Sequence, residues 1–171
     1  MANILLITDG ENHEWYNWLS KELIKRGNSI FQPPLPKTKT IKAWMEDIKD
    51  YRKHLDENSM IIGHGAGRVI LLKILEEKLR AVKGAHLISG KPLNEEFKEF
   101  NIKELDTEHI KNKTKNFFVY ASEKDDEKSL KESENIAEIL EEEVLILDNN
   151  KHFKNDKKFE DLLIDILSLT H

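Results

Sequence analysis

The stretch from Met60 to Leu72 constrains the fold of this chain most strongly. It starts with the apolar run Met60–Ile62 and continues with Gly63–Gly67, in which every second residue is glycine. It ends in the apolar run Val69–Leu72. A short apolar run closed by a glycine-dense turn is typical of a buried strand, and a longer segment that is apolar nearly all round is typical of a central helix. The pattern therefore predicts a buried strand, a sharp turn and a buried helix.

Similar apolar runs alternate with segments of helical periodicity along the rest of the chain. Strands are predicted at Ile4–Ile7, Asn28–Gln32, Ser59–Ile62, Val82–Ser89, Phe117–Ala121 and Val144–Leu147. Helices are predicted at 14–26, at 41–55 with Thr40 as N-cap, from the glycine turn to about Arg80, at 130–140 and at 159–167. This alternation predicts a single α/β domain over residues 1–171, a three-layer α/β/α sandwich around a mostly parallel sheet of about six strands. The charged segment 91–116 is expected to form short helices or a lid-like excursion.

Composition excludes several classes of function. The net charge of −5 argues against nucleic acid or an anionic membrane as the main partner. The chain contains no cysteine, which excludes disulfides, thiolate metal sites and cysteine nucleophiles. The first residues form a strand pattern rather than a signal peptide, and no apolar stretch approaches the roughly 20 residues that cross a bilayer. We expect a cytoplasmic protein.

Chemically important side chains follow several of the predicted strands. In a parallel α/β sheet the site lies beyond the carboxyl ends of the strands. Serine hydrolases of one such fold place a nucleophile on the turn G-x-S-x-G, an acid after a later strand and a histidine after the next. Here the corresponding positions hold Gly65, then Asp125 or Asp126, then His152. The acid and the base are needed because a hydroxyl is a weak nucleophile until an oriented imidazole takes its proton.

Other interpretations of these residues remain open. The two aspartates could be solvated turn residues, and His152 could be a surface histidine. The glycine turn could suggest a phosphate loop, but it lacks the G-x-G-x-x-G spacing and a Walker lysine. His13 and His64 could be structural residues near the turn. No group of acids and histidines has recognisable metal spacing, so we expect neither a metal nor a cofactor.

Taken together, four stretches resemble the small serine hydrolases related to retinoblastoma-binding protein nine and bacterial YdeN. These stretches are 13–23 with the run His-Glu-Trp-Tyr-Asn-Trp, 61–67, 122–126 and 151–153, and they cover nearly the whole chain. The resemblance implies a compact α/β-hydrolase fold and hydrolysis of carboxylic esters through serine, aspartate and histidine.

The resemblance also implies roles for particular positions. His152 matches the catalytic histidine, Asp125 matches the acid, and Gly65 occupies the position of the nucleophilic serine. The oxyanion hole would use the backbone N–H of Ala66 and one from the loop Gly10–Glu11. The pocket would include a further set of residues, His13, Trp15 and His64.

The departures from the family pattern concern the chemistry itself. Gly65 removes the nucleophile, and Lys151 stands where the family has glycine before the histidine. The Glu11 carboxylate, if it points into the site, opposes formation of an oxyanion. A nucleophile at such a turn usually has a strained positive φ, which glycine adopts without cost. The loss of serine is therefore expected to relax the turn while abolishing acyl-enzyme chemistry.

Three functional hypotheses follow. The leading one is a catalytically impaired serine-hydrolase relative that binds a small ester-like ligand or a protein partner. The second is an active esterase, either because the natural residue at position 65 is serine or because His152 and Asp125 activate water. The third is a protein-interaction module in which Trp15, Trp18 and Trp44 form a surface, although their helical spacing favours positions in the core.

Overall fold

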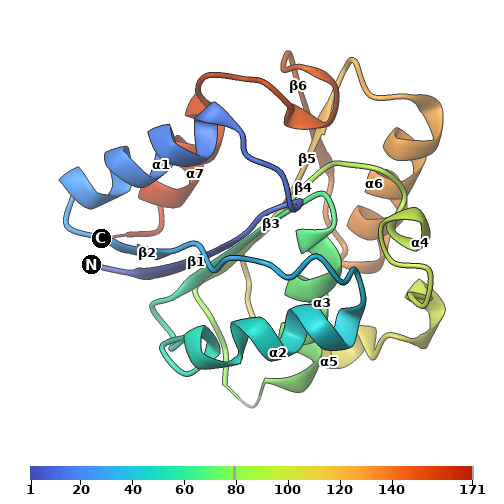
Figure 1. The fold of residues 1–171 in the computed structure, drawn as a ribbon, viewed down its shortest axis with the longest axis horizontal. Helices are drawn as coiled ribbons and strands as arrows, with labels where there is room; N and C mark the ends of the chain where they lie inside the picture. The colour runs from blue at the N-terminus through green and yellow to red at the C-terminus, as the bar shows by residue number, and fades with distance from the viewer. Residues whose placement is uncertain (79, 171) are drawn as a thin grey trace.

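The computed structural model describes residues 1–78 and 80–170. Six parallel strands form a single sheet in the order β2-β1-β3-β4-β5-β6 (Figure 1). The strands are β1 (Asn3–Ile7), β2 (Ser29–Phe31), β3 (Met60–His64), β4 (Gly84–Ile88), β5 (Phe117–Ser122) and β6 (Val144–Leu147). All six predicted strands are present. β3 runs two residues further than predicted, so that His64 is its last residue.

Helices cover both faces of the sheet, which confirms the predicted three-layer sandwich. The helices are α1 (Glu14–Lys25), α2 (Ile41–Arg52), α3 (Gly67–Glu77), α4 (Leu93–Glu96), α5 (Thr107–Lys111), α6 (Glu127–Ile139) and α7 (Glu160–Leu167). In Figure 1, α1 and α7 lie on one side of the sheet, and α2, α3, α5 and α6 lie on the other. α3 was predicted to end near Arg80 but ends three residues earlier, at Glu77, because Lys78 adopts an extended conformation. Leu79 lies outside the described residues.

Alternate residues of each strand supply two separate cores, as the two-residue period of a strand requires. Ile4 and Leu6 of β1 face α1 and α7, whereas Leu5 and Ile7 face α2, α3 and α6. In α3 the whole apolar run Val69–Leu72 is fully buried. The apolar run that follows the glycine turn in the sequence therefore forms the helix at the centre of the larger core.

The segment between β4 and β5 packs as part of the molecule rather than as a lid. It contains α4, a 3₁₀ turn at Ile102–Glu104, and α5. Of the two alternatives expected for this segment, short helices or a lid-like excursion, the structure shows the short helices. Its apolar side chains enter the larger core: Phe97, Phe100, Leu105 and Ile110 are all buried. This packing places Glu96, at the end of α4, beside the glycine turn. None of the helices in the described part of the chain has the length and apolar character needed to span a bilayer.

The tryptophans do not form an exposed surface. Trp15 and Trp44 are 0% and 2% exposed, and Trp18 is half-buried against the core between α1 and α7. A partner surface built from these three rings is therefore not supported, because their helical spacing turns them towards the two cores.

Candidate functional site

The turn between β3 and α3 has the geometry of a nucleophile elbow. Gly65 has a φ of +56°, and its N–H donates to the carbonyl oxygen of Ile88 at 3.0 Å. A Cβ at Gly63 would lie 2.6 Å from the carbonyl oxygen of Gly67, and one at Gly67 would lie 2.1 Å from that of Ile7. The outer glycines are therefore required by close approach of backbone, and Gly65 adopts its left-handed conformation without the strain that a side chain would bring.

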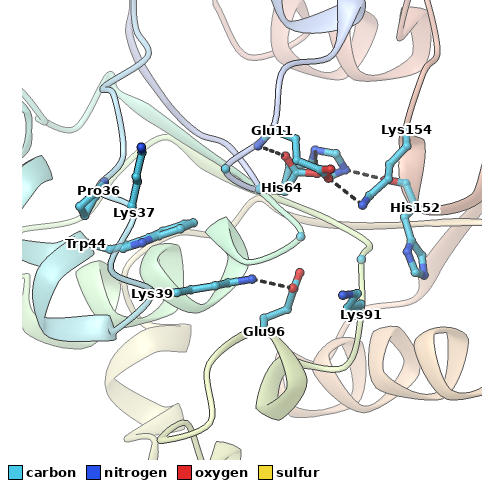
Figure 2. A pocket seen from close by; sticks show the side chains of 14 residues that line it. Glu11, Pro36, Lys37, Lys39, Trp44, His64, Lys91, Glu96, His152 and Lys154 are labelled. Carbon is cyan, nitrogen blue, oxygen red and sulfur yellow. Dashed lines mark hydrogen bonds and ion pairs between the residues drawn. The ribbon is translucent and has the colours of Figure 1, made fainter.

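The space in which a serine side chain would begin is already occupied. A Cβ built on Gly65 would lie 2.9 Å from Cβ of Asp9 and 3.0 Å from Oε2 of Glu96. Glu96 is 8% exposed, and its other carboxylate oxygen accepts a bond from Lys39 at 3.3 Å (Figure 2). Two carboxyl-bearing side chains thus crowd the position from which a nucleophile would act.

Asp125 lies where the loops after β4, β5 and β6 meet, and its carboxylate has three donors. Oδ2 accepts from the Ser89 hydroxyl at 2.7 Å and from the Ser122 backbone N–H at 3.0 Å. Oδ1 accepts from the backbone N–H of His152 at 2.8 Å. The structure therefore brings the predicted acid and histidine together, but through the histidine backbone rather than its ring.

The ring of His152 has a different partner. Its Nε2 lies 2.9 Å from Oγ of Ser129, a fully buried residue in the first turn of α6. Asp126 caps that helix by accepting from the Ser129 N–H, and its Oδ1 lies 3.8 Å from the same imidazole nitrogen. Burial lowers the pKa of His152. Figure 2 shows the imidazole directed away from the carboxylate of Glu11.

The N–H groups proposed for the oxyanion hole after β1 are already used. The Gly10 N–H donates to the Thr8 hydroxyl at 3.2 Å, and the Glu11 N–H donates to Oδ1 of Asp9 at 2.9 Å. Ala66 is fully buried at the start of α3. Local side chains thus accept from both N–H groups of the Gly10–Glu11 loop, and an oxyanion would have to replace one of these bonds.

A hydrogen-bonded cluster that the sequence did not reveal lies beneath the turn. Asp9 Oδ2 is 2.8 Å from Nε2 of His13, and Asp9 Oδ1 is 3.2 Å from the Tyr16 hydroxyl. That hydroxyl lies 2.5 Å from Nδ1 of His64, and Nε2 of His64 donates to the carbonyl oxygen of His152 at 2.6 Å. Only the position of Asp9, two residues after the end of a predicted strand, could have signalled this cluster.

Two groups of the cluster have shifted pKa values. Burial lowers the pKa of His64 from its ordinary value of 6.5 to about 4, so this ring is neutral at pH 7. Burial by itself would raise the pKa of Asp9, but the His64 ring and the hydrogen bond from His13 outweigh it and hold that pKa below its ordinary value. The cluster therefore combines a carboxylate with a neutral imidazole.

A pocket of about 310 Å³ opens above the turn and the cluster. Charged side chains line it: Asp9, Glu11 and Glu96 are acidic, and Lys37, Lys39, Lys91 and Lys154 are basic. Lys154 pairs with Glu11 at 2.7 Å across its rim (Figure 2).

The sequence-predicted pocket residues are divided by the structure. Gly10, Glu11, His64, Gly65 and His152 line the pocket. Trp15 does not, because its indole is fully buried beside α7 and donates to the Phe153 carbonyl oxygen at 2.8 Å. His13 lies behind Asp9 rather than at the pocket surface.

A parallel sheet in this strand order, with a glycine elbow after β3, an acid after β5 and a histidine after β6, defines the α/β-hydrolase fold. The serine hydrolase family model matches residues 7–169, and the chain belongs to this family.

Known proteins are similar to this chain in sequence and in fold. The chain is 27% identical over 167 residues to the putative hydrolase YdeN of Bacillus subtilis, covering 92% of this chain and 87% of the relative. The crystal structure of the B. subtilis ydeN gene product superposes with a TM-score of 0.82 at 22% identity, covering 98% of this chain and all of that one. A predicted CIB-like hydrolase from Thermoplasma acidophilum superposes with a TM-score of 0.70 at 17% identity, covering 99% and 86%. These two superpositions show the shared fold.

Proposed function

We propose that this protein is a member of the serine hydrolase family that binds a small, polar, ester-like ligand without forming an acyl-enzyme. The observation that carries the proposal is Gly65 at the elbow, with Asp9 and Glu96 in the space of the missing side chain. Acyl transfer needs a hydroxyl at that position and a base within hydrogen-bond reach of it. Without the hydroxyl, the remaining function of the pocket is binding.

The surrounding geometry supports the same proposal. The His152 ring bonds to Ser129 and the Asp125 carboxylate takes other donors, so the base lacks its orienting acid. Carboxylates of Glu11 and Glu96 line the region where an oxyanion would develop, which disfavours negative charge there. Both effects oppose turnover independently of the missing hydroxyl.

The charges of the pocket favour a ligand with an anionic group. In residues 1–78 and 80–170, Lys37 and Lys91 form no ion pair, whereas Lys39 and Lys154 are paired with acids. Two unpaired ammonium groups at the pocket could each donate a hydrogen bond to a carboxylate or an ester oxygen of the ligand. We also propose a cytoplasmic location, which the absence of cysteine supports.

Fluorophosphonate labelling of the purified protein tests the proposal. An active serine hydrolase of the same fold provides the positive control. We expect no covalent labelling and no hydrolysis of short-chain p-nitrophenyl esters above the rate with the His152→Ala variant. Stoichiometric labelling, or ester turnover that His152→Ala abolishes, contradicts the proposal.

One contact favours a second candidate, an active hydrolase with a displaced nucleophile. The pair Ser129 and His152 has the 2.9 Å separation of a nucleophile and its base. Ser129 is fully buried and does not line the pocket, so a substrate would have to displace the first turn of α6 to reach it. Labelling of the wild type that disappears in Ser129→Ala would establish this candidate; labelling unaffected by that variant would exclude it.

A further inference from the structure

The strongest unassigned feature of the molecule is the group of donor atoms beneath the elbow. Asp9, His13 and His64 each offer one ligand atom, and the three atoms lie within 4.8 Å of one another. They come from the loop after β1, the residue before α1 and the end of β3. We propose that these three residues bind a divalent transition-metal ion, with the pocket as its open side.

The protonation state of His64 suits a metal ligand. Its Nε2–H donates to the carbonyl oxygen of His152 at 2.6 Å, so the lone pair resides on Nδ1. That Nδ1 lies 3.8 Å from Asp9 Oδ2, and its lone pair accepts a hydrogen bond from the Tyr16 hydroxyl at 2.5 Å, which an ion would replace. A ligating histidine characteristically donates its second N–H to a backbone carbonyl or a carboxylate, which fixes the ring and its tautomer. His64 already has this arrangement, in a fully buried position.

Two of the distances between the donor atoms lie just below and within the range of ligand–ligand distances around a bound ion. Nitrogen and oxygen ligands lie about 2.0–2.2 Å from Zn²⁺, so two tetrahedrally placed ligand atoms are roughly 3–4 Å apart. Asp9 Oδ2 lies 2.8 Å from Nε2 of His13 and 3.8 Å from Nδ1 of His64. The ion would fit if the Asp9–His13 distance increased by a few tenths of an ångström and the Tyr16 hydroxyl turned away from Nδ1 of His64.

His13 would change its tautomer when the ion binds. In the structure its Nε2–H donates to Asp9, and its buried Nδ1 has no partner in the described part of the chain. Binding moves the proton from Nε2 to Nδ1, and the Nε2 lone pair then bonds to the ion. The Asp9–His13 and Tyr16–His64 hydrogen bonds are replaced by three metal–ligand bonds.

The ligand set and the access route define the class of ion. Two imidazoles and one carboxylate suit Zn²⁺, Co²⁺ or Fe²⁺, whereas Mg²⁺ and Ca²⁺ prefer oxygen ligands alone. Asp9 and His64 both line the pocket, so remaining coordination positions face the space above Gly65. Three protein ligands with a free position form an open site rather than a closed structural one.

Metal titration of protein without a polyhistidine tag tests the proposal. After chelator treatment we expect calorimetry with Zn²⁺ to show one site, with affinity at least tenfold weaker in Asp9→Asn and in His13→Gln. His54→Gln is the matched control, because His54 is exposed and stacks on Phe31 far from the cluster. Absence of stoichiometric binding, or binding that survives both ligand variants, overturns the proposal.

A second measurement uses only the wild-type chain, in case a buried variant does not fold. One equivalent of Co²⁺ is added and the proton NMR spectrum is recorded in H₂O and in D₂O. We expect two hyperfine-shifted, exchangeable resonances, one from His64 Nε2–H and one from His13 Nδ1–H. Binding of Co²⁺ without shifted imidazole N–H resonances contradicts the proposed ligands.

Discussion

Replacement of Gly65 by alanine measures how strongly this site excludes a side chain. Its Cβ would lie 2.9 Å from Cβ of Asp9 and 3.0 Å from Oε2 of Glu96, at a φ of +56°. A non-glycine residue in the left-handed region costs about 1–2 kcal/mol, and overpacking of a well-filled site adds about 1–3 kcal/mol. We therefore expect Gly65→Ala to lower the free energy of unfolding by about 2–5 kcal/mol.

Gly27→Ala is the matched control. Gly27 also has a positive φ, +83°, but a Cβ there would meet nothing within 4 Å. We expect this variant to lower the free energy of unfolding by the conformational term alone, about 1–2 kcal/mol. The difference between the two variants, about 1–3 kcal/mol, isolates the crowding at the elbow. Urea denaturation followed by tryptophan fluorescence measures both, because Trp15 and Trp44 are buried in the folded protein.

Equal destabilisation by the two variants would refute this reasoning. It would mean that Asp9 and Glu96 move aside without cost and that the elbow could hold a nucleophile. A further check is Gly65→Ala in a Glu96→Ala background. Because one of the two close contacts is then absent, the cost of the alanine at 65 should fall by at least about 0.5 kcal/mol, the usual lower limit of coupling between touching residues.

Two further outcomes concern stability. Burial lowers the pKa of His86 from 6.5 to about 3. Between these pH values His86 is protonated in the unfolded chain but not in the folded chain, so the stability present above pH 6.5 is lost as the pH falls towards 3. From pH 7 to pH 5 this loss is about 2 kcal/mol. Urea denaturation should show that His86→Phe, which also removes the 2.9 Å bond to the Tyr120 hydroxyl, no longer has this pH-dependent loss; an unchanged slope would contradict the shift. Trp15→Phe leaves the buried Phe153 carbonyl without its donor and should cost about 1–3 kcal/mol, against a smaller loss in half-buried Trp18→Phe measured in the same way.

The sheet and its order of elements could be predicted because their signals are local. Each strand is a continuous apolar run, and each helix repeats its apolar residues at a period of 3.6, so neither depends on distant contacts. The segment 91–116 was harder, since its helices are one or two turns long and depend on burial of Phe97 and Ile110 for their position. Helices that short have little intrinsic stability and follow tertiary packing.

The site could be predicted only as a set of positions. The elbow, Asp125 and His152 lie where the chain order placed them, but the orientation of the His152 ring depends on Ser129 in α6, a contact across 23 residues. The role of Asp9 depends on two histidines and a tyrosine that a single sequence does not relate to one another. Side-chain orientation and hydrogen-bond choice are properties of the assembled loops.

The close backbone contacts at the elbow have a consequence for how such chains are recognised. At Gly63 and Gly67 a side chain would collide with main-chain oxygen atoms of Gly67 and Ile7, whatever residue stands between them. Natural selection for a folded chain is then sufficient by itself to retain both glycines, with or without a nucleophile between them. A search for hydrolases by these two glycines therefore identifies the fold, and the residue between them has to be read separately.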